Sequence, residues 1–252
     1  MSHPCPVYLI NLPRDHERGE QMRQQISALG LETRRVDAVY GKDLQPHERD
    51  ALYSPALNLA RFHKPMSPGE IGCYASHLRV WETMRDDAAP MALVLEDDVA
   101  LGPELPALLA AVAQLPPQWD MIKLVGRDRE RVWRSWPLLE RWRVVRYRRA
   151  PSLTGAYLLS REGAAKLAAA RKPFYRPVDV DLRFWWETDL RLYGMLPYPI
   201  QLAEASFVSS IGQREQVGGF MYRWRKFRSQ VMYSWGSLTS NFRTRHDTPT
   251  GH

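Results

Sequence analysis

The sequence predicts an α/β protein organised around a mostly parallel sheet, and three observations lead to this prediction. Apolar, strand-like runs alternate with helical patterns along most of the chain, which is typical of strands joined by crossover helices. The run Met91–Leu95 is continuously apolar and leads directly into three acids, as expected for a strand buried on both faces. The 252 residues are 44% hydrophobic, which is enough apolar material for one large domain with a core.

The first elements form a strand–helix–strand unit. Residues 7–12 are aromatic and β-branched and stop at Pro13, which predicts a strand. A helical pattern runs from about Arg14 to Gly30, and a second strand follows at residues 33–39. Such a short unit predicts two parallel strands with a right-handed crossover.

The next segments predict an insertion and then a long helix. Residues 40–68 are polar, irregular and rich in proline, so we expect a loop with short helical pieces. A helix then begins at Ser67, since Ser67 and Glu70 form a capping box around Pro68 in the first turn.

The second half of the chain continues the alternation. We expect helices at residues 103–115 and 161–171 and strands at residues 119–125 and 153–160. Between them, residues 126–149 hold nine arginines and three tryptophans. This stretch is either a solvated hairpin whose arginine stems cover its tryptophans, or a surface that stacks on sugar or base faces and binds phosphates.

Three acids mark a candidate metal site. Glu96, Asp97 and Asp98 follow the buried strand, at the carboxyl edge of the sheet where open α/β folds bind ligands. Adjacent carboxylates repel one another unless they share a cation. Oxygen ligands of this kind suit Mg²⁺ or Mn²⁺, usually together with substrate phosphates. The alternative is a solvated acidic turn.

Polar residues after the first strand belong to the same predicted edge. Asn11, Arg14 and Arg18 follow the strand at residues 7–12, and arginines there can hold a diphosphate bidentately; otherwise they belong to a solvated first helical turn. His77, in the helix that starts at Ser67, is a candidate acceptor-binding residue or a hydrogen-bonded core histidine.

A second acidic segment is a candidate source of a general base. Asp179 and Asp181 lie two residues apart and are followed by Trp185 and Trp186, with Glu187 nearby as a further candidate base. A carboxylate beside tryptophans can act as a base in a partly dehydrated pocket, and tryptophan faces suit a sugar acceptor. The alternative is that Asp179 or Asp181 caps a helix.

Composition limits the partners and the compartment. The net charge of +7 indicates an anionic partner such as a membrane surface, a phosphorylated substrate or a nucleic acid. Cys5 and Cys73 are the two cysteines, and two such distant residues predict neither a disulfide framework nor a zinc pattern, in agreement with a reducing compartment. No signal peptide or membrane-spanning run is recognisable. We therefore expect a soluble or peripheral, cytoplasmic protein.

The C-terminal residues differ from the rest, so we expect a main domain at residues 1–215 and a basic helical tail at residues 216–252. Residues 216–246 contain no acid. Their apolar residues recur at helical spacing and predict one stripe, and cations are interspersed among them. Such a helix suits an anionic membrane surface, although it can instead dock on its own domain. The predicted membrane-binding residues are Phe220, Arg223, Trp224, Arg225, Lys226, Phe227 and Arg228, and the stripe continues to Val231 and Trp235.

In the order and spacing of its motifs, the chain resembles the family 25 glycosyltransferases, the bacterial enzymes that extend lipopolysaccharide or lipooligosaccharide, with collagen galactosyltransferases as distant relatives. The resemblance runs from Val7 to about Glu204. The matching motifs are Val7–Leu12 with Arg14 and Arg18, Ser67–Cys73 with Ser76, His77 and Trp81, Leu95–Val99, Thr154–Tyr157 with Gly163 and Ala164, and Pro177–Asp179.

The resemblance implies a GT-A-like, Rossmann-type fold, a sugar-nucleotide donor and transfer with inversion to a β-linkage. It also implies roles for particular residues: Asp98 as the metal ligand, Glu96 beside the ribose or the metal, Asp179 as the base. Thr154 and Gly155 are expected to contact the sugar nucleotide.

We therefore expect a glycosyltransferase that uses Mn²⁺ or Mg²⁺ and moves a sugar, galactose from UDP-galactose, onto a lipid-linked oligosaccharide. It would act on the cytoplasmic face of the bacterial inner membrane and would need no nucleic acid. Two alternatives remain from the residues themselves. A metal-dependent nuclease or nucleic-acid-binding protein would also combine clustered acids with a basic surface, and a non-catalytic membrane scaffold would need only the tail.

Overall fold

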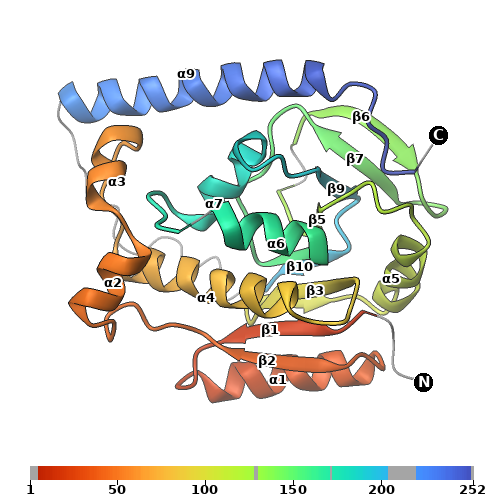
Figure 1. The fold of residues 1–252 in the computed structure, drawn as a ribbon. Helices are drawn as coiled ribbons and strands as arrows, with labels where there is room; N and C mark the ends of the chain where they lie inside the picture. Colours follow the sequence, from red (N-terminus) through yellow and green to blue (C-terminus); the bar gives the residue numbers. More distant parts are fainter. Residues whose placement is uncertain (1–4, 128–129, 171, 204–219, 251–252) are drawn as a thin grey trace.

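The computed structural model describes residues 5–127, 130–170, 172–203 and 220–250, without the side chains of residues 220 and 221. In this part, eight strands form one sheet in the order β2-β1-β3-β8-β5-β9-β7-β6, with helices packed around it (Figure 1). Two further strands, β4 and β10, form a small antiparallel pair. The predicted α/β architecture with a central sheet flanked by helices is confirmed.

The sheet is made of strands from along the whole described chain. Its strands are β1 (Val7–Asn11), β2 (Thr33–Asp37), β3 (Met91–Glu96), β5 (Met121–Lys123), β6 (Val132–Pro137), β7 (Arg143–Tyr147), β8 (Ala156–Ser160) and β9 (Leu192–Leu196), and the separate pair is β4 (Val99–Leu101) with β10 (Ile200–Leu202). The helices are α1 (His16–Ala28), α2 (Pro46–Leu52), α3 (Pro55–Arg61), α4 (Pro68–Arg85), α5 (Leu105–Ala113), α6 (Arg161–Ala170), α7 (Val178–Asp181), the 3₁₀ helix η1 (Leu182–Glu187) and α9 (Phe220–Arg243).

Strand direction agrees with a mostly parallel sheet. β1 pairs in parallel with both β2 and β3, and β5 pairs in parallel with β9. β8 is antiparallel to both of its neighbours, and β7 is antiparallel to both of its own. Six of the eight strands of this sheet therefore point the same way, and the carboxyl ends of β1 and β3 lie side by side.

Local sequence signals explain where several helices begin and end. Gly30 has φ +69° and lies just past α1, where a left-handed residue terminates a helix at little cost for glycine. Ser67 and Glu70 form the predicted capping box at the start of α4. Ser160 accepts a hydrogen bond from the amide of Gly163 and so caps α6. The arginine-rich stretch forms the β6–β7 hairpin.

Two apolar clusters cover the two faces of the sheet. One packs beneath α4 and α6 and includes Tyr74, Trp81 and Tyr157, all completely buried. The other packs beneath α1 and α5 and includes Ile26, Leu108 and Leu158, which are also completely buried. β3 contributes alternate residues to both clusters, since its side chains alternate between the faces. The apolar run before the acids is therefore the centre of the fold.

The C-terminal helix α9 lies along the edge of the molecule opposite α1 (Figure 1). It docks on the domain through one face: Tyr233 and Ser237 are buried, and Ser237 donates a hydrogen bond to the carbonyl of Arg148, 2.7 Å away. Asn241 donates to the carbonyl of Tyr147 in β7 at 3.3 Å. The structure therefore shows α9 docked on its own domain, the alternative that the sequence left open. Among the described helices, none is both long enough and apolar enough to span a membrane.

Candidate active site

A pocket of about 270 Å³ lies at the carboxyl ends of β1 and β3, beside the first turns of α4. Six of the predicted site residues line it, and they come from segments far apart in the sequence: Asn11, Arg14, Arg18, His77, Glu96 and Asp97. Three other hollows of the described surface lie elsewhere: along β2, on α9 and around Pro151. We take the pocket between β1, β3 and α4 as the candidate site because it collects the predicted residues.

Asn11, Asp97 and Arg18 form one side of the pocket. The Asn11 amide donates to Asp97 Oδ2 at 2.6 Å, and Arg18 Nη2 lies 3.5 Å from the same oxygen. Burial raises the pKa of Asp97, while Asn11 and Arg18 oppose this rise. Arg18 also pairs with Asp15 at 2.8 Å, and Arg14 stacks on the Tyr40 ring at 4.0 Å. The arginines are therefore at the mouth of the pocket with exposed guanidinium groups.

Glu96 is held on the other side by His77 and Thr154. His77 Nε2 lies 3.2 Å from Glu96 Oε1, and Thr154 Oγ1 donates to the same oxygen at 2.8 Å. Burial alone would raise the pKa of Glu96, but these two hydrogen bonds hold it below its usual value. The carboxylate is therefore ionised at neutral pH and has a fixed orientation.

His77 is itself fixed by a buried hydrogen-bond chain. Trp81 Nε1 donates to the Tyr157 hydroxyl at 3.0 Å, and that hydroxyl lies 2.8 Å from His77 Nδ1. If the hydroxyl proton is donated to Nδ1, then Nε2 carries the ring proton and donates it to Glu96. Both ring nitrogens of His77 therefore have hydrogen-bond partners, as in a core histidine, and His77 also lines the pocket. It was predicted to bind the acceptor, but it lies next to the residues predicted to bind the sugar nucleotide.

Asp98 and Gly155 lie next to each other at the same edge. A methyl group built at Gly155 would come within 3.1 Å of Val99 and 3.8 Å of Asp98 Oδ1, so glycine permits the close approach of these segments. Burial raises the pKa of the Cys73 thiol, and the charges of nearby carboxylates, among them Glu96, Asp179 and Asp98, add to the rise. The charge of Asp98 therefore acts on a residue that lines the pocket.

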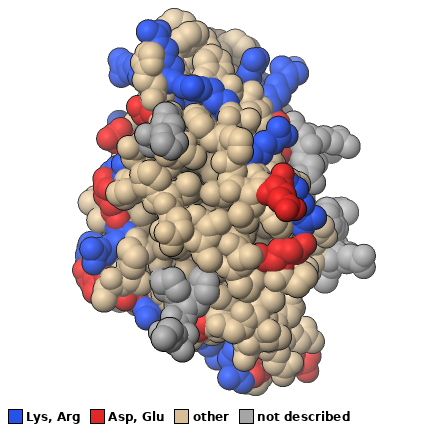
Figure 2. Space-filling model, turned by 90° about the vertical axis from the view of Figure 1, so that its right-hand side faces the viewer, with Lys and Arg blue, Asp and Glu red and all other residues tan. Residues whose placement is uncertain are grey.

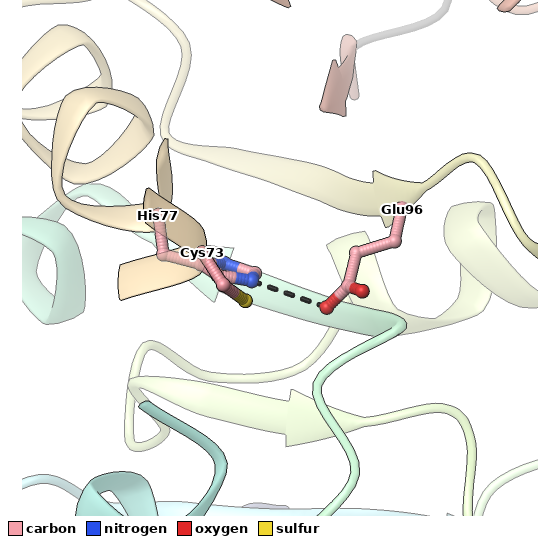
Figure 3. Close-up of side chains that lie close together, drawn as sticks. All are labelled: Cys73, His77 and Glu96. Carbon is pink, nitrogen blue, oxygen red and sulfur yellow. Dashed lines mark hydrogen bonds and ion pairs between the residues drawn. The ribbon is translucent and has the colours of Figure 1, made fainter. Parts of the chain in front are cut away.

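Cys73 completes a group that the sequence did not predict. Its thiol lies beside the His77 ring and faces Glu96 (Figure 3), and the ligand atoms of these three residues lie within 4.8 Å of one another. Burial raises the pKa of the Cys73 thiol well above its usual value, and the neighbouring carboxylates add to the rise. The thiol is therefore protonated at neutral pH.

Asp179 lies near a buried lysine, which sequence analysis also missed. Burial raises the pKa of Asp179, and the charge of Lys123 opposes this rise. Lys123 is completely buried at the end of β5, donates to the Pro151 carbonyl at 2.7 Å, and has a pKa that burial lowers to about 7. A lysine inside the apolar run Met121–Val125 was the signal available in the sequence.

Asp181 and Glu187 occupy a different environment from Asp179. Both are paired with the guanidinium of Arg176, which is 3% exposed and stacks on the Phe184 ring at 3.8 Å. Asp181 also accepts a hydrogen bond from the Tyr74 hydroxyl. These contacts engage Asp181 in the core and Glu187 nearer the surface, so Asp179 is the better candidate for a base.

The buried pairing of Arg176 leads to a stability prediction. Arg176→Ala should lower the free energy of unfolding by about 3–5 kcal/mol, because it leaves the buried Asp181 carboxylate without its partner. Urea denaturation followed by circular dichroism measures this change. The control is Arg23→Ala, which removes an exposed ion pair with Glu20 and should leave the unfolding midpoint nearly unchanged. An equally small effect of Arg176→Ala would contradict a structural role for this network.

The two tryptophans predicted for the acceptor do not line the pocket. Trp186 packs against Tyr233 of α9, with ring centroids 5.6 Å apart, and a methyl group at Gly236 would come within 2.4 Å of it. Trp185 packs partly buried against the core. Trp186 therefore holds α9 on the domain.

Comparisons with known proteins identify the family. The family profile described as "Glycosyltransferase family 25 (LPS biosynthesis protein)" matches residues 5–182. The chain belongs to glycosyltransferase family 25. This family 25 chain is 32% identical to a "Glycosyltransferase 25 family member" of Drosophila melanogaster over 181 residues, which are 69% of this chain and 29% of that protein. It is 30% identical to "Procollagen galactosyltransferase 2" of Homo sapiens over 182 residues, again 69% of this chain and 29% of that protein.

The family 25 chain thus spans about three tenths of the length of the curated relatives that it matches. A solved glycosyltransferase involved in the glycosylation of the major capsid of PBCV-1 matches with a TM-score of 0.33 and 14% identity, over 67% of this chain and 66% of that one. That likeness is too distant to place residues. Membership of family 25 favours the predicted glycosyltransferase over the nucleic-acid alternative.

Proposed function

We propose that the chain is a metal-dependent, inverting glycosyltransferase that moves galactose from UDP-galactose onto a lipopolysaccharide or lipooligosaccharide saccharide. The observation that carries this proposal is the pocket at the ends of β1 and β3, which is lined by Arg14 and Arg18 and by the carboxylates of Glu96 and Asp97. Such a pocket offers cationic groups to a diphosphate and oxygen ligands to a cation that accompanies it.

The cation would be Mn²⁺ or Mg²⁺, held by Asp98 and Glu96. The chemistry of these residues fits a hard cation, because both supply carboxylate oxygens and both lie close enough to the same thiol to raise its pKa. A bound cation of this kind would neutralise charge on the leaving diphosphate.

Side chains of the protein would bind the diphosphate and transfer the proton. Arg14 and Arg18 would bind diphosphate oxygens at the pocket mouth, and Thr154 would keep Glu96 oriented. Asp179 would take the proton from the acceptor hydroxyl as that oxygen attacks the anomeric carbon opposite the leaving diphosphate. Because Asp179 is half-buried and its pKa is raised, it is a stronger base than an exposed aspartate. Orientation and charge stabilisation would supply most of the rate.

A panel of sugar nucleotides tests the proposal most directly. The protein is incubated with Mn²⁺ and each common UDP-, GDP- and CMP-sugar, and slow hydrolysis to the free nucleotide is measured by chromatography. We expect UDP-galactose to be hydrolysed in a metal-dependent manner. Hydrolysis of a GDP- or CMP-sugar alone would show that the donor nucleotide is not UDP. A lack of hydrolysis of every sugar nucleotide would contradict the proposed activity.

We also propose that α9 holds the enzyme on an anionic membrane, at the cytoplasmic face of the bacterial inner membrane, where a lipid-linked acceptor is available. Its apolar stripe lies on the side opposite the docked Tyr233 and Ser237. The stripe is strongly exposed, and its members are Trp224, Phe227, Val231, Trp235, Leu238 and Phe242. Phe220, predicted as part of it, has its side chain outside the described part.

Basic residues lie on α9 outside the stripe. Arg223, Lys226 and Arg228 are exposed near the start of α9, and Lys and Arg side chains gather at the top of the face in Figure 2, where α9 and the hairpin end. Each such cation near an anionic surface contributes about 1 kcal/mol. Because α9 docks through one face, its apolar face is exposed and held in a fixed orientation. This arrangement supports the proposal that α9 binds a membrane.

Removing the apolar stripe should abolish vesicle binding. The triple variant Trp224→Ser, Phe227→Ser and Trp235→Ser changes side chains that are 53%, 59% and 70% exposed, so the fold should be retained. Losing their insertion should weaken binding by at least about 100-fold. Co-sedimentation with anionic vesicles at low and high salt measures the change, and wild-type binding should fall partly at high salt.

The matched control is Leu139→Ser, which removes an exposed apolar residue from the turn between β6 and β7. It should bind vesicles like the wild type. Deletion of α9 is a poorer test, because it uncovers Trp186. Equal sedimentation of the triple variant and the wild type would show that the stripe does not bind lipid.

A further inference from the structure

Three side chains on the wall of the candidate pocket have the composition of a zinc site. Cys73 and His77 lie one turn apart on the same face of α4, since residues i and i+4 of a helix are neighbours. Glu96 approaches them from the end of β3 (Figure 3). The thiol sulfur, a ring nitrogen and a carboxylate oxygen lie within 4.8 Å of one another. In the described part of the chain, no other set of three such residues is gathered in this way.

The ligand types discriminate between metals. Sulfur and imidazole ligands favour zinc and other thiophilic ions, whereas Mg²⁺ and Mn²⁺ prefer carboxylate, carbonyl and water oxygens. Zinc binds sulfur at about 2.3 Å and nitrogen or oxygen at about 2.0 Å in a tetrahedron, which requires ligand atoms roughly 3.5 Å apart. Small side-chain rotations therefore suffice to close the existing arrangement around an ion.

The surroundings match those of metal-ligating residues. His77 is oriented through its other ring nitrogen by the Tyr157 hydroxyl at 2.8 Å, and Glu96 is oriented by Thr154 at 2.8 Å. Such outer hydrogen bonds fix ligand orientation in metal sites. Cys73 lines the pocket, so an ion can reach its thiol from the pocket. The fourth position of a tetrahedral ion would face the pocket.

We propose that Cys73, His77 and Glu96 form a binding site for Zn²⁺ or a similar thiophilic divalent cation. Binding removes the thiol proton of Cys73 to solvent. The ring proton of His77 moves from Nε2 to Nδ1, where it is donated to the Tyr157 hydroxyl. The hydrogen bond between His77 and Glu96 is replaced by two metal–ligand bonds. Glu96 is then no longer available to the Mn²⁺ or Mg²⁺ that accompanies the sugar nucleotide. Zinc therefore inhibits transfer, a consequence that rests on the proposed function, whereas the site itself does not.

The binding test uses the full chain without any sugar nucleotide. Zn²⁺ affinity is measured by competition with a chromophoric chelator, and Co²⁺ is used as a spectroscopic substitute. We expect one ion per chain and a thiolate-to-cobalt absorption band in the near ultraviolet. Cys73→Ser should remove this band. It should also weaken Zn²⁺ binding by about 100-fold or more, since loss of an outer hydrogen-bond partner alone costs about 10- to 100-fold and Cys73 is a direct ligand. The control is Cys5→Ala, which removes the other cysteine from a buried position and should keep both the band and the affinity.

The outcomes are distinct. A cobalt band that persists in Cys73→Ser, or zinc affinity that is equal in Cys73→Ser and wild type, would overturn the site. If the site is present, zinc should inhibit hydrolysis of UDP-galactose in wild type and in Cys5→Ala at concentrations that leave Cys73→Ser active. Zinc binding without any hydrolysis activity in any variant would contradict the proposed function and leave the site standing.

Discussion

Asp179→Asn should lower kcat by about 10²- to 10⁴-fold, the range that a general base contributes, while UDP binding stays close to that of the wild type. The reason is that the charge of Asp179 acts on the Cys73 thiol, which lines the pocket, but Asp179 is not among the residues that line it together with Arg14 and Arg18. Steady-state kinetics and calorimetric titration with UDP separate the two effects.

The discriminating variant is Glu187→Gln, since Glu187 was predicted as an alternative base. Its pairing with Arg176 leads us to expect lower stability but an unchanged kcat per folded molecule. A full rate in Asp179→Asn together with a large loss in Glu187→Gln would reverse the assignment of the base.

The pH profile gives an independent check on Asp179. A general base works in its ionised form, so the rate falls as the pH decreases through its pKa. Because burial raises the pKa of Asp179, this acidic decline should occur at a higher pH than about 3.9, the usual value for aspartate. The decline assigned to Asp179 should be missing from the residual activity of Asp179→Asn.

Asp98→Asn should lower metal-dependent kcat/KM by about 10²- to 10³-fold. A cation on the leaving diphosphate is worth several kcal/mol, and each 1.36 kcal/mol corresponds to a factor of ten. The affinity for UDP in Mn²⁺ should fall, whereas the affinity in the absence of metal should change little. Hydrolysis of UDP-galactose and UDP titrations with and without Mn²⁺ measure these quantities. Wild-type turnover in Asp98→Asn would exclude Asp98 from the site.

Much of the framework could be predicted because it depends on local patterns. The apolar run before Glu96 predicts a buried strand, and the pattern around Ser67 predicts the start of a helix; both are confirmed by β3 and α4. β1 and β3 are parallel, as expected for a mostly parallel sheet, so their carboxyl ends bring Asn11 and Asp97 to one edge.

The residues that were missed depend on contacts between distant segments. Cys73 was counted as one of two remote cysteines, and a count of cysteines cannot reveal a histidine and a glutamate beside it. Asp181 resembled Asp179 in sequence, and only the fold brings Arg176 against it. On the inner face of α9, Ser237 and Asn241 donate hydrogen bonds to the carbonyls of residues 147 and 148. A hydropathy pattern assigns such polar residues to the solvent side of a helix, so it could not predict these contacts.

The strand order has a consequence for which acceptors the enzyme can reach. α9 bonds to β7, and the pocket lies at β3, four strand steps away across β8, β5 and β9. At about 4.8 Å per step, the pocket is held roughly 19 Å from the strand on which α9 rests. With α9 between this strand and a lipid surface, a saccharide anchored in that surface must extend across at least this distance before its end meets Asp179. The width of the sheet would then select acceptors by the length of their glycan.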